Sequence, residues 1–228
     1  MDLRATMEAD GEWPEDVGDA GDRRAHDLLV DLLARERPDD AILSEEGRDD
    51  LARLAAHRVW IVDPLDGTRE FSEPGRTDWA VHVALAIDGA AVAGAVALPA
   101  RGITLATNPA PQPSPRWDGP PRLVVSRSRP PHQANLIRQA LDGELIPLGS
   151  AGAKAMAVVL GEADIYAHAG GQYEWDNAAP TAVAAAAGLH VSRLDGSPLV
   201  YNRRDPWLPD VLICRSDLAD AVLDALSR

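Results

Sequence analysis

The chain has 228 residues, 46% of them hydrophobic, and a formal net charge of −14 at pH 7. A chain of this length can bury one large core or two small ones. The negative charge argues against binding to nucleic acid polymers or anionic membranes, although bound metal ions would still admit an anionic substrate.

The single cysteine, Cys214, excludes an intrachain disulfide and favours a reducing compartment. The acidic N-terminus lacks the apolar segment of a signal peptide, and no uncharged apolar stretch is long enough to cross a bilayer. We therefore expect a cytoplasmic protein.

The first half, residues 1–120, is predicted to be an α+β subdomain. Residues 1–22 show little periodicity and are expected to form a loop. Apolar residues at helical spacing predict a helix from Gly21 to Arg37, ended by Pro38. Beyond it we expect a helical segment at Asp49–His57. The predicted strands of an antiparallel sheet are Ala41–Leu43, Val59–Val62, Asp78–Ile87, Ala90–Leu98 and Arg101–Thr107. The Asp88-Gly89 dipeptide predicts a hairpin.

A proline-rich crossing, Pro109–Pro121, precedes the second half, residues 121–228, which is predicted to be an α/β subdomain. Its predicted strands are Leu123–Ser126, Glu144–Leu148, Asp164–His168 and Val211–Cys214. Its predicted helices are Pro131–Leu141, a segment from Ser150 to Leu160, Trp175–Ala187 and Ser216–Ser227. Alternating strands and helices indicate an α/β layered fold.

The stretch Val59–Phe71, VWIVDPLDGTREF, carries the clearest chemical signal. An apolar strand ends at Asp63, Pro64 is expected to turn the chain, and Asp66 follows three residues later. Gly67 permits close approach of the backbone, and a helical turn is expected to begin beside it. Two carboxylates next to free N–H groups suit a divalent metal and a phosphate. An acidic capping turn without an ion is the alternative.

Carboxylates recur at the ends of other predicted elements. Glu45 and Glu46 follow a short strand, and Asp176 follows Trp175 at a helix start. Taken separately, the glutamates could be a solvated turn and Asp176 a helix cap. Together, and without a histidine or cysteine cluster, they favour magnesium over zinc.

Three segments in this order resemble the signatures of the inositol monophosphatase superfamily, which comprises magnesium-dependent, lithium-sensitive phosphatases. They are SEEG at 44–47, WIVDPLDGT at 60–68 and EWDNAA at 174–179. The second half, especially 149–154 and 168–176, is most similar to the bacterial CysQ branch. That branch hydrolyses 3′-phosphoadenosine 5′-phosphate to AMP in sulfur metabolism. The resemblance covers residues 17–228 and implies a layered αβαβα sandwich.

The resemblance implies which residues hold the metal ions. Glu45, Asp63 and the carbonyl of Leu65 would bind a first magnesium ion. Asp63, Asp66 and Asp176 would bind a second, so the two halves must meet at the site. Two metal ions together can activate a water and neutralise a leaving oxygen.

The resemblance also implies catalytic groups. Thr68, oriented by Asp22, would position and deprotonate the attacking water. The N–H groups of Gly67 and Thr68 would bind phosphate oxygens. Asp22 and Glu45 would border a third, looser metal position.

In this interpretation the second half selects the substrate, a small phosphorylated molecule. Ser126, Arg127 and Arg129 follow a strand and could grip a second phosphate, or form a solvated basic turn. His168 is the one histidine assigned to the pocket. The other histidines and the six tryptophans are interpreted as surface or core residues.

Further pocket residues are expected around the helix that follows Gly149 and Ser150, whose backbone could contact a ribose. Lys154 lies one turn past Ser150 and is the only lysine among 22 basic residues, which suggests a need for a compact ammonium. Gln172 and Tyr173 are expected to line the pocket, although Tyr173 could equally belong to the core.

The chain departs from the superfamily at its start. Members usually begin with a long helix before the segment that matches Val17–Leu33, and none is predicted here. The Thr-x-Ala-Asp pattern around Asp22 is altered to DAGD at 19–22. The resemblance leaves a homodimer open.

The leading hypothesis is a phosphatase of 3′-phosphoadenosine 5′-phosphate. Within the superfamily the rivals are inositol monophosphatase and fructose-1,6-bisphosphatase, against which Lys154 and 126–129 argue. Haloacid dehalogenase phosphatases use Asp-x-Asp, whereas two residues separate Asp63 from Asp66. A non-catalytic metal- and nucleotide-binding module is a further alternative. Asp66→Asn is expected to cut turnover by orders of magnitude and to leave folding nearly intact.

Overall fold

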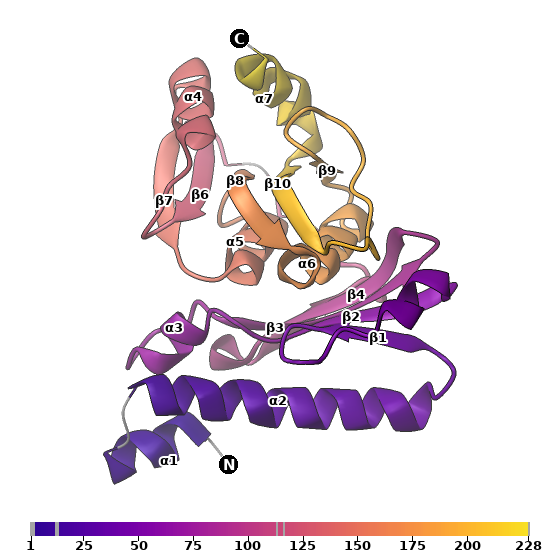
Figure 1. Cartoon of the computed structure of the whole chain (residues 1–228). Coiled ribbons are helices and arrows are strands. Elements are labelled where there is room, and N and C mark those ends of the chain that lie inside the picture. Colours follow the sequence, from indigo (N-terminus) through magenta and orange to yellow (C-terminus); the bar gives the residue numbers. More distant parts are fainter. Residues whose placement is uncertain (1–2, 12–13, 113, 116, 228) are drawn as a thin grey trace.

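The computed structural model describes residues 3–11, 14–112, 114–115 and 117–227, which form stacked layers of helices and sheets (Figure 1). From one end to the other, the layers are α2, a first sheet, the helices α5 and α6, a second sheet, and the helices α4 and α7. This is the layered α/β architecture predicted from the sequence.

The prediction of a loop at residues 1–22 is wrong, because helices lie there. Helices α1 (Leu3–Asp10) and α2 (Pro14–Glu36) occupy the described part of this segment. Proline suits the first position of a helix because its missing N–H has no partner there. Gly21, which weakens the helical pattern, lets α2 approach the helix α3 (Thr68–Ser72) closely, since a Cβ there would lie 2.8 Å from the Phe71 ring.

The first sheet has the strand order β1-β2-β3-β4-β5. Its strands are β1 (Ala41–Ser44), β2 (Arg58–Asp66), β3 (Ala80–Ile87), β4 (Ala90–Leu98) and β5 (Ile103–Ala106). The short helices η1 (Leu51–Ala55), α3 (Thr68–Ser72) and η2 (Pro99–Arg101) lie in the connections. The hairpin at Asp88-Gly89 is confirmed, and both residues have positive φ angles.

Two details of this sheet differ from the prediction. β1 pairs in parallel with β2, because the connection through η1 carries the chain back before β2 begins, so the sheet is not wholly antiparallel. The predicted turn at Pro64 is instead an irregularity within β2, where the pairing shifts between Asp63 and Asp66. A proline in a strand donates no ladder hydrogen bond and is typical of such bulges.

The second sheet has the order β7-β6-β8-β10-β9, with β6 parallel to β7 and β8, and β10 antiparallel to β8 and β9. The strands are β6 (Arg122–Ser126), β7 (Glu144–Leu148), β8 (Ile165–Tyr173), β9 (His190–Ser192) and β10 (Trp207–Cys214). The helices are α4 (His132–Leu141), α5 (Ala151–Val159), α6 (Glu174–Ala186), η3 (Ser216–Leu218) and α7 (Ala219–Leu226). β9 was not predicted from the sequence, and β8 and β10 are longer than predicted.

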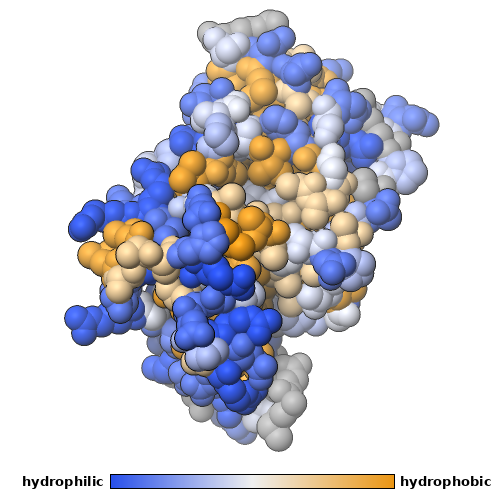
Figure 2. Space-filling model, turned by 90° about the vertical axis from the view of Figure 1, so that its right-hand side faces the viewer, coloured by the Kyte–Doolittle hydropathy of each residue, from blue (hydrophilic) through white to orange (hydrophobic). Residues whose placement is uncertain are grey.

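A single buried cluster joins the two sheets through the middle helices. It includes Ile61 and Val96 of the first sheet, Met156 of α5, Val183 of α6 and Ile213 of the second sheet. In Figure 2, apolar patches lie mainly across the middle of one face, while hydrophilic side chains dominate below. The division into subdomains 1–120 and 121–228 stays a prediction, since the halves share this core.

None of the helices in the described part of the chain combines the length and apolar character that a membrane crossing requires.

Candidate active site

Three carboxylates from the two halves converge where β2 meets α6. One ligand oxygen each of Asp63, Asp66 and Asp176 lies within 4.8 Å of the others. The irregularity in β2 presents Asp63 and Asp66, and the start of α6 presents Asp176. The capping reading of Asp176 also holds, since its Oδ2 accepts the Tyr173 N–H at 2.6 Å.

The electrostatics of this cluster fit a cation. Burial, together with the charges of Asp66 and Glu45, holds the pKa of Asp63 well above its usual range. Burial and the charge of Asp66 raise the pKa of Asp176 to about 6. Glu45 is exposed and lies outside this group of three, yet partial desolvation and the charge of Asp176 raise its pKa to about 7. Such carboxylates repel one another, and hard divalent cations relieve that repulsion.

Asp66 differs from its neighbours because donors surround it. It accepts hydrogen bonds from the Ser150 hydroxyl and from the backbone N–H groups of Ala151 (3.0 Å) and Gly152, and His82 Nε2 lies 3.2 Å away. Burial alone would raise the pKa of Asp66, but His82, Ser150 and Gly152 outweigh it and lower the pKa to about 2. Asp66 therefore anchors the start of α5, and we revise the expectation that Asp66→Asn leaves folding nearly intact.

A hydrogen-bonded pair of a carboxylate and a hydroxyl lies beside the cluster. Asp22 of α2 accepts a hydrogen bond from Thr68 Oγ1 at 3.0 Å, and Thr68 Oγ1 also lies 3.2 Å from the carbonyl oxygen of Leu65. Burial raises the pKa of Asp22 to about 6, and the charge of Glu46 adds to the effect. The other oxygen, Oδ1, is buried and has no partner within the described residues.

A cavity of about 680 Å³ opens from the carboxylates into the second half. All of the predicted substrate-binding residues except Thr68 line it, namely Gly67, Ser126, Arg127, Arg129, Gly149, Ser150, Lys154, Gln172 and Asp176. The cavity therefore lies between the acidic cluster and a wall that carries cationic side chains.

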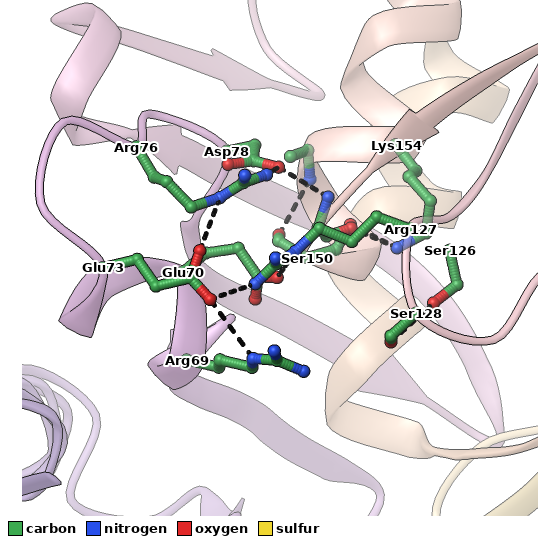
Figure 3. Close-up of polar contacts among 12 residues, drawn as sticks. Arg69, Glu70, Glu73, Arg76, Asp78, Ser126, Arg127, Ser128, Ser150 and Lys154 are labelled. Carbon is green, nitrogen blue, oxygen red and sulfur yellow. Dashed lines mark hydrogen bonds and ion pairs between the residues drawn. The ribbon is translucent and has the colours of Figure 1, made fainter. Parts of the chain in front are cut away.

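Arg127 is already paired within the protein. Figure 3 shows it reaching from the second half to Glu70 and Glu73, at 2.7 and 2.6 Å. The bonds to these carboxylates raise the pKa of Arg127, and Arg127 keeps the pKa of Glu73 below its usual value. Binding of a phosphate by Arg127 stays a prediction, and it would require an exchange of partners.

The other two cations of the cavity are placed differently. Lys154 is buried, and its Nζ donates to the carbonyl oxygens of Ser150 (2.7 Å) and Gly149 and lies 5.5 Å from the centre of the Tyr166 ring. Burial lowers its pKa. Arg129 is exposed, and its guanidinium pairs with no carboxylate among the residues described.

Sequence reasoning missed several residues at the site. His82 was grouped with the surface and core histidines, yet it is fully buried between Asp66 and the carbonyl of Trp175. The strand register could have indicated it, because β3 pairs His82 with Asp63. Glu70 and Trp207 also line the cavity without having been predicted, and His168 lines it as predicted.

Comparisons with known proteins agree with this geometry. The model of the inositol monophosphatase family matches residues 3–112 and 120–226. The chain belongs to the inositol monophosphatase family.

Relatives in this family place the chain near one branch. A 3′-phosphoadenosine 5′-phosphate phosphatase of Mycobacterium bovis is 53% identical in an alignment of 238 residues, which covers 100% of this chain and 87% of that protein. The 3′(2′),5′-bisphosphate nucleotidase CysQ of Escherichia coli K12 is 34% identical over 83% of this chain and 81% of its own length. The crystal structure of CysQ from Bacteroides thetaiotaomicron superposes with a TM-score of 0.72 at 29% identity, covering 85% of this chain and 83% of that one. In a member of this family, the cluster of Asp63, Asp66 and Asp176 fits a metal site.

Proposed function

We propose that this chain hydrolyses 3′-phosphoadenosine 5′-phosphate to AMP and phosphate in a magnesium-dependent, lithium-sensitive reaction. The observation that carries the proposal is the cluster of Asp63, Asp66 and Asp176 at one end of a cavity with cationic walls. The name of the Mycobacterium bovis relative, 53% identical, supports the choice of substrate. A cytoplasmic role in sulfur metabolism is proposed with it, and a homodimer stays a prediction.

The proposed metal ligands are carboxylates of both halves and one carbonyl, namely Glu45, Asp63, Leu65, Asp66 and Asp176. Their excess negative charge supports two or three magnesium ions, which prefer oxygen ligands. Bound magnesium would lower the pKa of the attacking water and neutralise the leaving oxygen.

Thr68 and Asp22 are proposed to take the proton of the attacking water. Thr68 Oγ1 donates to Asp22, so its lone pairs stay free to accept a hydrogen bond from that water. With a pKa of about 6, Asp22 is mostly ionised at pH 7 and still basic enough to accept a proton through Thr68. The water oxygen attacks phosphorus, the bond to the ribose 3′ oxygen breaks, and that oxygen takes a proton from solvent water and leaves as a hydroxyl.

The substrate is proposed to bind between the two halves. The phosphate under attack would meet the N–H groups of Gly67 and Thr68, and the ribose would lie against Gly149 and Ser150. The second phosphate would meet Ser126, Arg127, Arg129 and Lys154, and Gln172 would line the pocket. Arg129 is the most available cation, since no carboxylate in the described part of the chain pairs with its guanidinium.

The test is phosphate release in magnesium from 3′-phosphoadenosine 5′-phosphate, inositol 1-phosphate and fructose 1,6-bisphosphate, each with and without lithium. The proposal expects preference for the nucleotide, with loss of activity in lithium or in a chelator. Preference for inositol 1-phosphate would contradict the substrate assignment and keep the metal site. No release from any substrate by folded protein would favour the non-catalytic alternative.

A further inference from the structure

Two exposed aromatic side chains stand at the edge of the cavity. Tyr173 is 46% exposed and Trp207 is 43% exposed. Among the exposed large hydrophobic side chains of the described residues, only these two line the cavity. They are cross-strand partners at the ends of β8 and β10, which lie side by side in Figure 1. Direct partners on antiparallel strands place their side chains on the same face of the sheet, so both aromatic groups lie on one side of it.

Tyr173 is held in place by a stack that continues into the core. Its ring lies parallel to that of Trp175, with centroids 4.7 Å apart and an interplanar angle of 11°. Trp175 in turn packs against the main buried cluster. One face of the Tyr173 ring is therefore covered and fixed, and the exposure of the residue leaves its other side to the cavity. A flat ligand could add a further layer without reordering the protein.

Trp207 is fixed by a close approach to the backbone. A Cβ on Gly171 would lie 2.4 Å from the indole Nε1 and 2.8 Å from Cε2, and Gly171 has a φ of +97°. Only glycine suits this position, on both steric and conformational grounds. The indole thus rests on the β8 backbone at the rim of the cavity.

A polar side chain between the two aromatic residues and the core is already engaged. The Gln172 side-chain amide donates to the Tyr166 hydroxyl at 2.9 Å and accepts from the Asn177 side chain at 3.4 Å. Tyr173 and Trp207 therefore offer aromatic surface in a cavity that is also lined by the cations Lys154 and Arg129. Sequence-tolerant recognition of nucleobases uses aromatic surfaces in this way.

We propose that Tyr173 and Trp207 form a platform on which the base of a nucleotide substrate stacks, and that this platform selects nucleotides over other phosphorylated small molecules. This inference rests on the proposed function and deepens it. An aromatic cross-strand pair that only stabilises the sheet is the alternative, and it would make no distinction between ligands with and without a base.

The experiment is calorimetric binding of AMP and of ribose 5-phosphate, which differ by the base, to the magnesium-loaded protein. The platform predicts that AMP binds about 5- to 150-fold more tightly, the range that stacking of one base supplies. Tyr173→Leu and Trp207→Leu should each remove most of that preference and leave the affinity for ribose 5-phosphate unchanged. Tyr173→Phe and Trp207→Phe should retain it, because they keep a ring.

Equal affinity of the wild-type protein for the two ligands would overturn the platform. So would leucine variants that lose both ligands alike, since that is the result expected of a purely structural pair. Phosphate release from 3′-phosphoadenosine 5′-phosphate is measured separately. Absence of release would overturn the proposed function, whereas the platform is judged by the binding preference alone.

Discussion

Two neighbouring clusters of charge in this molecule are built in opposite ways. Around Arg127, each carboxylate has a cationic partner, and the bonds to Arg127 keep the pKa of Glu73 low (Figure 3). At the junction of β2 and α6, no side chain of the described residues donates a hydrogen bond to Asp63 or Asp176, the nearest cationic group to Asp63 is the His82 ring at 3.9 Å, and burial raises the pKa values of both carboxyls. The first cluster is complete without a ligand, and the second lacks positive charge.

This difference indicates what each cluster does. Paired charges between α3 and the β6–α4 connection tie the two halves of the chain together. Unpaired buried carboxylates cost stability, and such costs are typical of functional sites. The missing charge is what a divalent cation would supply.

The largest effect is expected from Asp63→Asn. Loss of a charged oxygen ligand should lower kcat by about three orders of magnitude. The free energy of unfolding in chelator should stay within about 1 kcal/mol of wild type or rise, because asparagine can still accept the Leu65 N–H and carries no charge. Steady-state kinetics and urea unfolding measure both quantities. Asp27→Asn, on the exposed face of α2, is the matched control, and near wild-type turnover for Asp63→Asn would disprove the metal assignment.

Asp66→Asn should combine loss of turnover with loss of stability. Asparagine cannot accept all of the bonds from Ser150, Ala151 and Gly152, and a buried donor is left unpaired. We expect a decrease of about 3 kcal/mol in the free energy of unfolding, measured in urea. A stability equal to that of Asp63→Asn would show that Asp66 does not anchor α5.

Arg127→Gln should affect stability less. It leaves the buried carboxylate of Glu70 without its cation, so the free energy of unfolding should fall. Glu73→Gln, at the more exposed side of the same network, should lower it by less. Urea unfolding of both variants measures the difference, and equal costs would contradict the role given to Glu70.

The smallest effect is the pH dependence of the chelated protein. The pKa values of Asp22 and Asp176 are raised to about 6, so the folded state binds more protons than the unfolded state between roughly pH 4 and pH 6. Stability is therefore greatest below pH 4 for these groups and is lost as pH rises through 6. Between pH 5 and pH 7.5 the Tm in chelator should fall by roughly 2 to 4 °C relative to magnesium-loaded protein. A parallel change in both samples would contradict the claim.

The sequence predicted most of this arrangement where local rules apply. Apolar runs located the main strands, and Asp88-Gly89 located a hairpin. The three motif segments predicted that Asp63, Asp66 and Asp176 would meet, although Asp176 is distant in the chain.

What the sequence did not show depends on tertiary contact. The start of α2 carries glycines and weak periodicity, and it is helical because Val17 packs with Leu65 and Phe71. Likewise Arg127 looked like a free phosphate ligand, since only the fold brings Glu70 to it. The burial of His82 against Asp66 has the same origin.

The most direct test of the central claim, that carboxylates of both halves hold the cation, is calorimetric titration of the folded protein with magnesium. The account predicts saturable binding by the wild type and its loss in both Asp63→Asn and Asp176→Asn, one variant from each half. Wild-type binding by Asp176→Asn would contradict a site shared between the halves, and no binding by any of the three proteins would contradict the site itself.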